Sequence, residues 1–162
     1  AINIDPLIFG GTGIDSANQD MPSDVPVRYE AGSHNISAIA GLNAALKWIL
    51  SIGVDSIFTE EQKKKEKLID LLREYDNITV IVPENSIGVV SCVFDGYSSD
   101  NIGQVLSDMN IAVRTGLHCA PAAHKFIGTF PAGTVRFSLS YFNDESDFKI
   151  LNEALTYIED NS

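Results

Sequence analysis

The second half of the chain alternates between two hydrophobic periods, and this alternation limits the folds open to it. From residue 78 onward, short runs rich in β-branched residues are separated by stretches with an apolar residue every three or four positions. The first pattern is typical of strands and the second of amphipathic helices. Strands are expected at 78–82, 88–94, 111–115 and 134–140, and helices at 99–109, near residue 119 and after residue 143. Strands that alternate with helices predict an α/β fold, here a small mixed sheet with helices packed on it.

The first half of the chain divides at residue 35. Residues 1–35 contain several glycines and prolines and show no clear hydrophobic period. From Asn35, a good N-cap residue, an apolar run predicts a helix that ends at Gly53. Because that helix is apolar nearly all round, we expect it to be buried on most sides. A charged, amphipathic helix is predicted from about Ser56 to Tyr75.

The composition excludes several classes of protein. The 162 residues carry a formal net charge of −11, and so acidic a surface repels nucleic acid phosphates and anionic lipids. No apolar run approaches the roughly 18 residues of a membrane span, and the first residues do not resemble a signal peptide. The 2 cysteines and 3 histidines give no metal signature, and a disulfide is not expected. We therefore expect a cytoplasmic protein that acts on small molecules or proteins.

Two of the predicted strands carry an arginine. In TVRFSLS, apolar residues alternate with Arg136, Ser138 and Ser140, so Arg136 lies on the polar face of its strand. Such an arginine is usually exposed or paired, and it can also serve as a planar, bidentate clamp for a carboxylate. Arg114 ends the preceding strand, and two strand arginines in an acidic chain can form a local anion site.

The sequence RTGLHCAP places Cys119 beside a predicted helix start. Pro121 favours the first turn of a helix and disfavours a helical conformation in the residue before it. The free amides at a helix start stabilise a thiolate, and Arg114 and His118 add to this effect. Cys119 is therefore either a nucleophile or a buried, inert cysteine. Cys92, in the run GVVSCVF, is expected to be a small core residue.

A glycine-rich segment, GGTG at residues 10–13, allows two interpretations. It is either a plain turn or a loop whose backbone amides approach a phosphate. It lacks the spacing of a P-loop or a dinucleotide-binding motif.

Together, four motifs resemble the C-terminal part of the class V aminotransferase family. They are LIFGGTG, RYEAGSHN before an apolar helix, IAVRTGLHCAP and TVRFSLSYFND, and the resemblance runs from about residue 7 to the end. RTGLHCAP ahead of TVRFS is the specific part, and it is similar to the cysteine desulfurase and selenocysteine lyase branch. Two positions depart from the common pattern, since Leu117 stands where many relatives have histidine and His34 where many have proline.

The resemblance implies a homodimeric pyridoxal 5'-phosphate (PLP) enzyme of the fold type I architecture. Family members convert L-cysteine to L-alanine and retain the sulfur as a persulfide. The resemblance implies that Cys119 is the catalytic cysteine and that Arg136 holds the substrate carboxylate, with Arg114 and His118 near the substrate. A further set matches the loop that reaches the cofactor phosphate of the neighbouring protomer: Gly11, Thr12 and Ser16.

The same resemblance assigns the chain to part of a larger enzyme. The family's Schiff-base lysine precedes the GGTG segment, so Lys125, which follows RTGLHCAP, is interpreted as an ordinary helix residue. Residues 1–35 then correspond to a stub of the large PLP-binding domain and residues 36–162 to the C-terminal small domain, which we expect to be inactive alone. The alternatives are another PLP reaction, such as transamination or selenocysteine cleavage, and a sulfur-carrying module that works without PLP. A sulfur-acceptor protein is a further candidate partner.

Overall fold

The computed structural model describes residues 4–15, 17–83 and 85–161. The chain separates into two units, Ala1–Ser51 and Ile52–Ser162. This division falls at the end of the first long helix, whereas the boundary drawn from the sequence lies before it, at residue 35.

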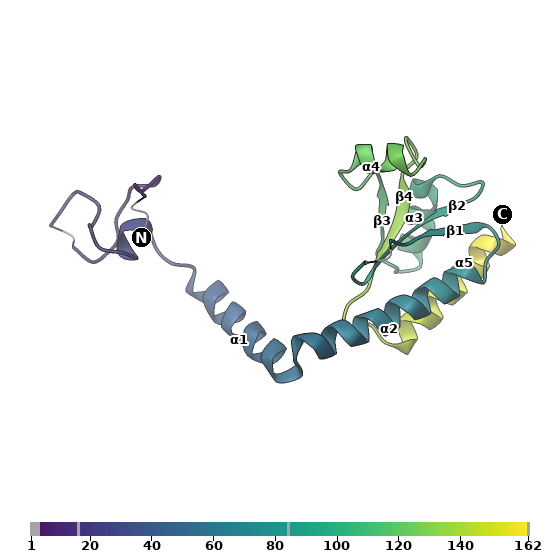
Figure 1. Ribbon diagram of the computed structural model, residues 1–162, viewed down its shortest axis with the longest axis horizontal. Helices are drawn as coiled ribbons and strands as arrows, with labels where there is room; N and C mark the ends of the chain where they lie inside the picture. Colours follow the sequence, from purple (N-terminus) through teal and green to yellow (C-terminus); the bar gives the residue numbers. More distant parts are fainter. Residues whose placement is uncertain (1–3, 16, 84, 162) are drawn as a thin grey trace. The chain divides into compact units, whose positions relative to one another are not determined.

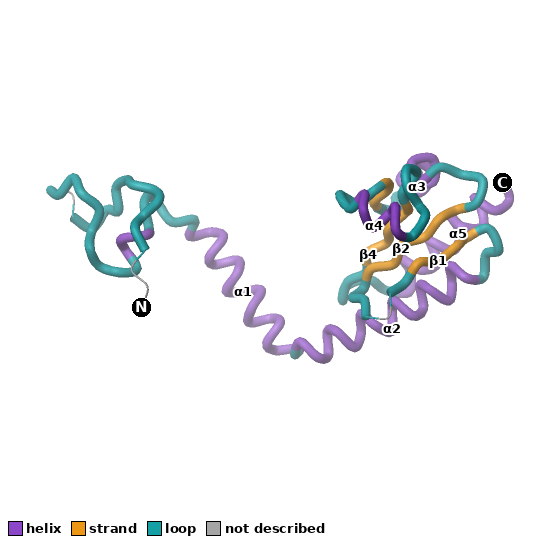
Figure 2. Tube along the Cα trace, turned by 45° about the horizontal axis from the view of Figure 1, so that its top comes forward, coloured by secondary structure: helices purple, strands orange, loops and turns teal. Residues whose placement is uncertain are grey.

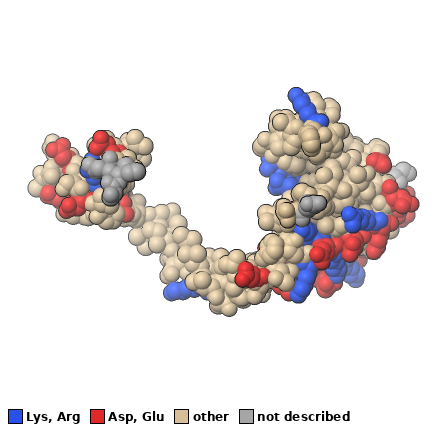
Figure 3. Space-filling view, viewed as in Figure 1, with Lys and Arg blue, Asp and Glu red and all other residues tan. Residues whose placement is uncertain are grey.

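Unit 1 is mostly loop and ends in a long helix. A short helical turn, η1, covers Val27–Tyr29, and α1 covers Ile36–Ile52. Asn35 caps α1 as predicted, because its Oδ1 accepts a hydrogen bond of 3.0 Å from the backbone N–H of Ala38. No residue of α1 is buried, so the expected burial of this helix is wrong for this chain: the described part of unit 1 does not cover its apolar side chains. The large apolar residues that α1 exposes are Ile36, Ile39, Leu42, Leu46 and Leu50, and Figure 3 shows how few charges it carries.

Unit 2 contains the α/β fold that the alternating pattern predicts. Its helices are α2 (Val54–Arg73), α3 (Ser99–Asp108), α4 (Pro121–Phe126) and α5 (Glu145–Asp160). Its strands are β1 (Ile78–Ile81), β2 (Val89–Phe94), β3 (Arg114–Gly116) and β4 (Thr134–Ser138). Each element overlaps its predicted range, although β3 begins later than the sequence pattern indicates.

The described strands form one sheet in the order β1-β2-β4-β3, and every neighbouring pair is antiparallel. We expected a mixed sheet from the alternation of strands and helices along the sequence. β2 and β3 do run in the same direction, but β4 lies between them and pairs antiparallel with both (Figure 1). The α/β class is therefore confirmed, and the mixed pairing is corrected.

Helices α2, α3 and α5 pack on one face of this sheet and enclose a single hydrophobic core (Figures 1 and 2). Alternate residues of β2 and β4 face the helices, which confirms the alternation predicted for TVRFSLS. The buried residues of β2 and β4 on this face are Val90, Cys92, Phe94, Val135 and Phe137. Arg136 lies on the opposite face, where the strand register aligns it with Ser91 and Arg114.

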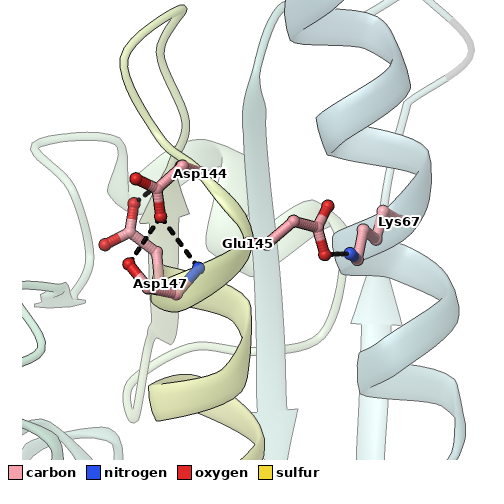
Figure 4. Close-up of polar contacts among 5 residues, drawn as sticks. Lys67, Asp144, Glu145 and Asp147 are labelled. Carbon is pink, nitrogen blue, oxygen red and sulfur yellow. Dashed lines mark hydrogen bonds and ion pairs between the residues drawn. The ribbon is translucent and has the colours of Figure 1, made fainter.

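Polar contacts define the start of α5 and join it to α2 (Figure 4). Asp144 is the N-cap of α5, and Asp144 and Asp147 form a capping box, in which each side chain accepts a hydrogen bond from the other's backbone N–H. Glu145 forms an ion pair with Lys67 of α2. The capping box fixes the start of α5, and the Lys67–Glu145 pair links α5 to α2.

Among the described residues, no single helix is both long enough and apolar enough to span a membrane. Taken together, α1 and α2 pass this test by length and composition.

Candidate active site

Cys119 lies on the loop between β3 and α4, immediately before the helix (Figure 1). Ala120 is the N-cap of α4 and Pro121 is its first residue, so the predicted position of Cys119 beside a helix start is confirmed. The thiol forms no disulfide and is exposed, which excludes the buried, inert alternative.

Cys92 has the opposite environment. Its side chain is fully buried on β2, with Sγ 3.8 Å from the carbonyl oxygen of Val135. Burial raises the pKa of the Cys92 thiol to about 12, because the thiolate would lose its hydration. Cys92 is a protonated core residue, as its sequence context predicts.

The loop that carries Cys119 has an unusual backbone. His118 and Cys119 both have positive φ angles, of 50° and 62°, in the left-handed region that non-glycine residues rarely adopt. Where the loop leaves β3, Gly133 lies against Gly116, and a Cβ at position 133 would come within 2.3 Å of Gly116 backbone atoms. Only glycine fits there, so the loop lies directly against the start of β4.

Arg114 and Arg136 are direct cross-strand partners on β3 and β4. Arg114 Nη2 donates a hydrogen bond of 3.1 Å to Cys119 Sγ, which places a cation in contact with the sulfur. Arg136 is half-buried, and its Nε has no hydrogen-bond partner among the described residues. An N–H buried in this way normally finds an acceptor, so Arg136 is suited to an anionic ligand. The exposed alternative for Arg136 does not hold.

His118 is the side chain that connects this loop to the sheet. A hydrogen bond of 2.8 Å joins its Nε2 to Thr134 Oγ1, while its Nδ1 is buried with no partner among the described residues. Burial lowers the pKa of His118, and the positive charge of Arg136, followed by His124 and Arg114, lowers it further. The imidazole is therefore neutral near pH 7.

Two residues that contact His118, Thr134 and His124, were not predicted from the sequence to do so. Thr134 is buried at the start of β4, and the strand alternation that places Arg136 on the open face also places Thr134 there. His124 is buried on α4, with Nδ1 2.6 Å from Thr129 Oγ1 and its ring centroid 5.6 Å from that of His118. No sequence signal relates His124 to Thr129, because their contact depends on the turn after α4.

The GGTG loop belongs to unit 1. Gly11 is exposed, and its carbonyl oxygen accepts a hydrogen bond of 2.8 Å from Gly32 N–H. Neither Gly11 nor Gly13 has any atom within 4 Å of the position a Cβ would take, so an anion can approach this backbone closely, and Thr12 is half-buried beside it. These residues fit a contact with a phosphate group. Ser16, the remaining residue of the predicted set, lies outside the described residues.

Lys125 lies on the surface of α4. Its side chain is exposed, with Nζ 5.0 Å from the centroid of the Phe130 ring. In the described ranges, no group of three or more His, Cys, Asp or Glu side chains is arranged to hold a metal ion. The charged or titratable side chains grouped with Cys119 are those of Arg114, Arg136 and His118.

The neutral state of His118 predicts a pH dependence of stability. The unfolded chain protonates this histidine near pH 6.5, whereas folded His118 takes up the proton only at lower pH. Below about pH 6.5 the unfolded state therefore binds more protons, and the free energy of unfolding should fall as the pH falls. The lowered pKa values of Glu60 and Asp144 act in the same direction but at more acidic pH.

Urea unfolding of the chain and of His118→Gln at several pH values between about 7.5 and 5 measures this effect. The wild-type chain should lose stability across the window, and His118→Gln should show a flatter profile. His34→Gln, the same substitution in unit 1, should follow the wild type. Parallel profiles for all three proteins would contradict the assignment.

Comparison with known proteins gives consistent matches. The family model described as "Aminotransferase class-V" matches residues 2–151. A probable cysteine desulfurase 2 of Mycobacterium leprae is 34% identical over 149 residues, which cover 88% of this chain and 35% of the relative. A probable cysteine desulfurase of Methanothermobacter thermautotrophicus is 30% identical over 160 residues, or 96% of this chain and 40% of the relative.

A solved structure agrees with these relatives. The apo structure of the cysteine desulfurase from Thermococcus onnurineus NA1 matches with a TM-score of 0.81 at 29% identity, over 97% of this chain and 40% of that one. The chain thus spans 35% to 40% of the length of the proteins it matches.

Proposed function

This chain belongs to the class-V aminotransferase family, and we propose that it forms part of a PLP-dependent cysteine desulfurase in which Cys119 receives the sulfur atom. The observation that carries the proposal is the contact between the exposed Cys119 thiol and the Arg114 guanidinium, beside the half-buried Arg136. An accessible thiol next to a fixed cation is a typical environment for a nucleophilic cysteine.

The substrate is anchored by the two arginines in this proposal. The Nε of Arg136 lacks a protein acceptor among the described residues, so the guanidinium can pair with the carboxylate of L-cysteine through parallel hydrogen bonds. His118 is neutral and close enough to Arg136 for that charge to lower its pKa, and its buried Nδ1 has no partner among the described residues. Charge recognition by Arg136 and a neutral imidazole nearby together favour an amino acid with a free carboxylate.

PLP, when bound, supplies the electron sink that makes the C–S bond of the substrate labile. In this chain Gly11, Thr12 and Ser16 are the residues proposed to contact the phosphate of the cofactor. The lysine that binds PLP covalently is proposed to lie outside these 162 residues, since the relatives are much longer. Residues 1–35 are then the end of the large domain and residues 36–162 the small domain.

The sulfur transfer is carried by Cys119. Its thiolate attacks the sulfur of L-cysteine, an S–S bond forms and the C–S bond breaks. The electron pair of the broken bond stays on the substrate carbon, which takes up a proton to give L-alanine, and Cys119 is left as a persulfide. Arg114 donates a hydrogen bond to Cys119 Sγ and steadies its negative charge before the attack.

The whole enzyme is proposed to be a cytoplasmic homodimer that hands its sulfur to an acceptor protein. The exposure of Cys119 supports delivery to a partner, and the net charge of −11 argues against nucleic acid as that partner. The test is the reaction of the full-length protein with L-cysteine and PLP in the presence of a thiol reductant. Equal amounts of alanine and sulfide are expected. Alanine from selenocysteine alone, or keto acid in place of alanine, would favour another PLP reaction.

The 162-residue chain alone should not bind PLP covalently. Its one lysine near the RTGLHCAP motif, Lys125, is an exposed helix residue over the ring of Phe130. The measurement is incubation with PLP, dialysis, borohydride reduction and peptide mapping, with the full-length protein as the positive control. Stoichiometric labelling of one lysine in the short chain would overturn this part of the proposal.

A further inference from the structure

The conformation that presents Cys119 is one that the local sequence does not favour by itself. His118 and Cys119 are consecutive non-glycine residues with left-handed backbone angles. Residues in such conformations persist only where the surrounding structure holds them. The backbone of the loop contributes one turn, in which Ala120 N–H donates to the Leu117 carbonyl at 2.8 Å. Gly133 packs against Gly116 at the base of the loop, and side chains supply further restraint.

Among the described residues, two side-chain hydrogen bonds connect this loop to the sheet. One is the contact of Arg114 with Cys119, already assigned to the thiol. The other joins His118 Nε2 to Thr134 Oγ1 at 2.8 Å. Thr134 is only 1% exposed, begins β4 and is paired in register with Gly116, so its hydroxyl is a rigid point on the sheet.

The His118 ring also lies close to a second buried side chain. His124, which is 4% exposed, lies with its ring centroid 5.6 Å from that of His118. His124 is itself fixed, because its Nδ1 bonds to Thr129 Oγ1 and its carbonyl oxygen accepts hydrogen bonds from the N–H groups of Thr129 and Phe130. The His118 ring therefore contacts both a buried hydroxyl and a buried ring.

We propose that Thr134 is a positioning residue that acts through His118: its hydroxyl holds the left-handed His118–Cys119 backbone and so keeps Cys119 Sγ against Arg114. This inference rests on the proposed role of Cys119 as the sulfur-accepting nucleophile. Among the described residues, Thr134 makes its side-chain contact with the site through the His118 imidazole, and its effect is on the position of the thiol. Loss of the hydroxyl frees the imidazole, the loop relaxes toward ordinary φ angles, and Sγ moves away from its cation.

The experiment measures the rate at which iodoacetamide alkylates Cys119 near neutral pH in the 162-residue chain, read by mass spectrometry. Thr134→Val removes the hydroxyl and keeps the shape. It should slow the reaction about tenfold, because the thiol then loses its hydrogen bond from the charged Arg114 guanidinium. Thr134→Ser keeps the hydroxyl and should restore a near wild-type rate. Thr115→Val is the matched control. Thr115 lies on β3, the strand adjacent to β4, and its hydroxyl donates a hydrogen bond to Asp100 of α3.

A second variant protects the test against unfolding. His118→Phe keeps a ring of similar shape without the nitrogen that contacts Thr134, and it should slow alkylation as much as Thr134→Val does. The double variant should show no further slowing, because both changes break the same contact. Cys92 reports on the fold, since a buried thiol reacts only when the chain unfolds.

Wild-type alkylation in a folded Thr134→Val chain would overturn the proposal, and so would additive effects of the two substitutions. If Thr134→Val unfolds the chain and so exposes Cys92, the alkylation rates of the other two variants decide the question. The proposal then requires a near wild-type rate for Thr134→Ser and a slow rate for His118→Phe. None of these measurements uses PLP or L-cysteine, so their outcome is separate from that of the desulfurase assay.

Discussion

Replacing Cys119 by alanine in the full-length enzyme is expected to reduce alanine and sulfide formation from L-cysteine by at least about a hundredfold. The substitution removes the atom that accepts sulfur, while the arginines that surround it stay in place. Binding of PLP, followed by its absorbance, should be unchanged, because no contact of Cys119 with the cofactor is part of the proposed mechanism. The kinetic loss should appear in kcat rather than in KM.

Cys92→Ala is the matched control for this substitution. Cys92 is fully buried in the core and has a raised pKa, so it cannot replace Cys119 as nucleophile in the folded protein. The control should lose some stability by leaving a small cavity but keep its turnover. If Cys119→Ala retained normal turnover, the thiol would be incidental, and another class-V reaction would account better for the site.

Replacing Arg136 by alanine is expected to raise the KM for L-cysteine about tenfold to a hundredfold, since a hydrogen bond to a charged group contributes about 1.5–3 kcal/mol. Arg136 is half-buried, directly across from Arg114, and its Nε has no acceptor among the described residues. Arg136→Lys should recover only part of the affinity, because an ammonium group cannot pair with both carboxylate oxygens in one plane. Steady-state kinetics with L-cysteine measures both effects.

Arg73→Ala provides the comparison for Arg136→Ala, since it removes an exposed arginine at the end of α2. Its KM should match that of the wild type. A KM that is equally insensitive to Arg136→Ala would show that the substrate carboxylate binds elsewhere, and the anion site beside Cys119 would need another ligand.

The local sequence pattern predicted the helices and strands of unit 2 and part of the candidate site. The alternation in TVRFSLS placed Arg136 on the face away from the helices, and the proline at position 121 located the start of α4. The apolar surroundings of Cys92 predicted its burial. In each case the determining interaction lies within a few residues along the chain, so the sequence window contains the cause.

The features that were missed depend on residues far apart in sequence. The insertion of β4 between β2 and β3 made the sheet antiparallel, and no local pattern specifies strand order. The exposure of α1 could not be anticipated, because an apolar helix pattern does not say whether the covering surface is present in the same chain. The link from Thr134 to His118 spans sixteen positions and exists only because β3 and β4 pair.

The most direct test of the sulfur-accepting role is the covalent state of Cys119 after a single turnover. The full-length enzyme is mixed with PLP and L-cysteine in the absence of reductant and acceptor, and the thiols are then blocked. The masses of the cysteine-containing peptides are measured by mass spectrometry. The account predicts one additional sulfur atom on the peptide that contains Cys119, in amounts equal to the alanine released, and none on the peptide that contains Cys92. Alanine released without any sulfur bound to Cys119 would contradict it.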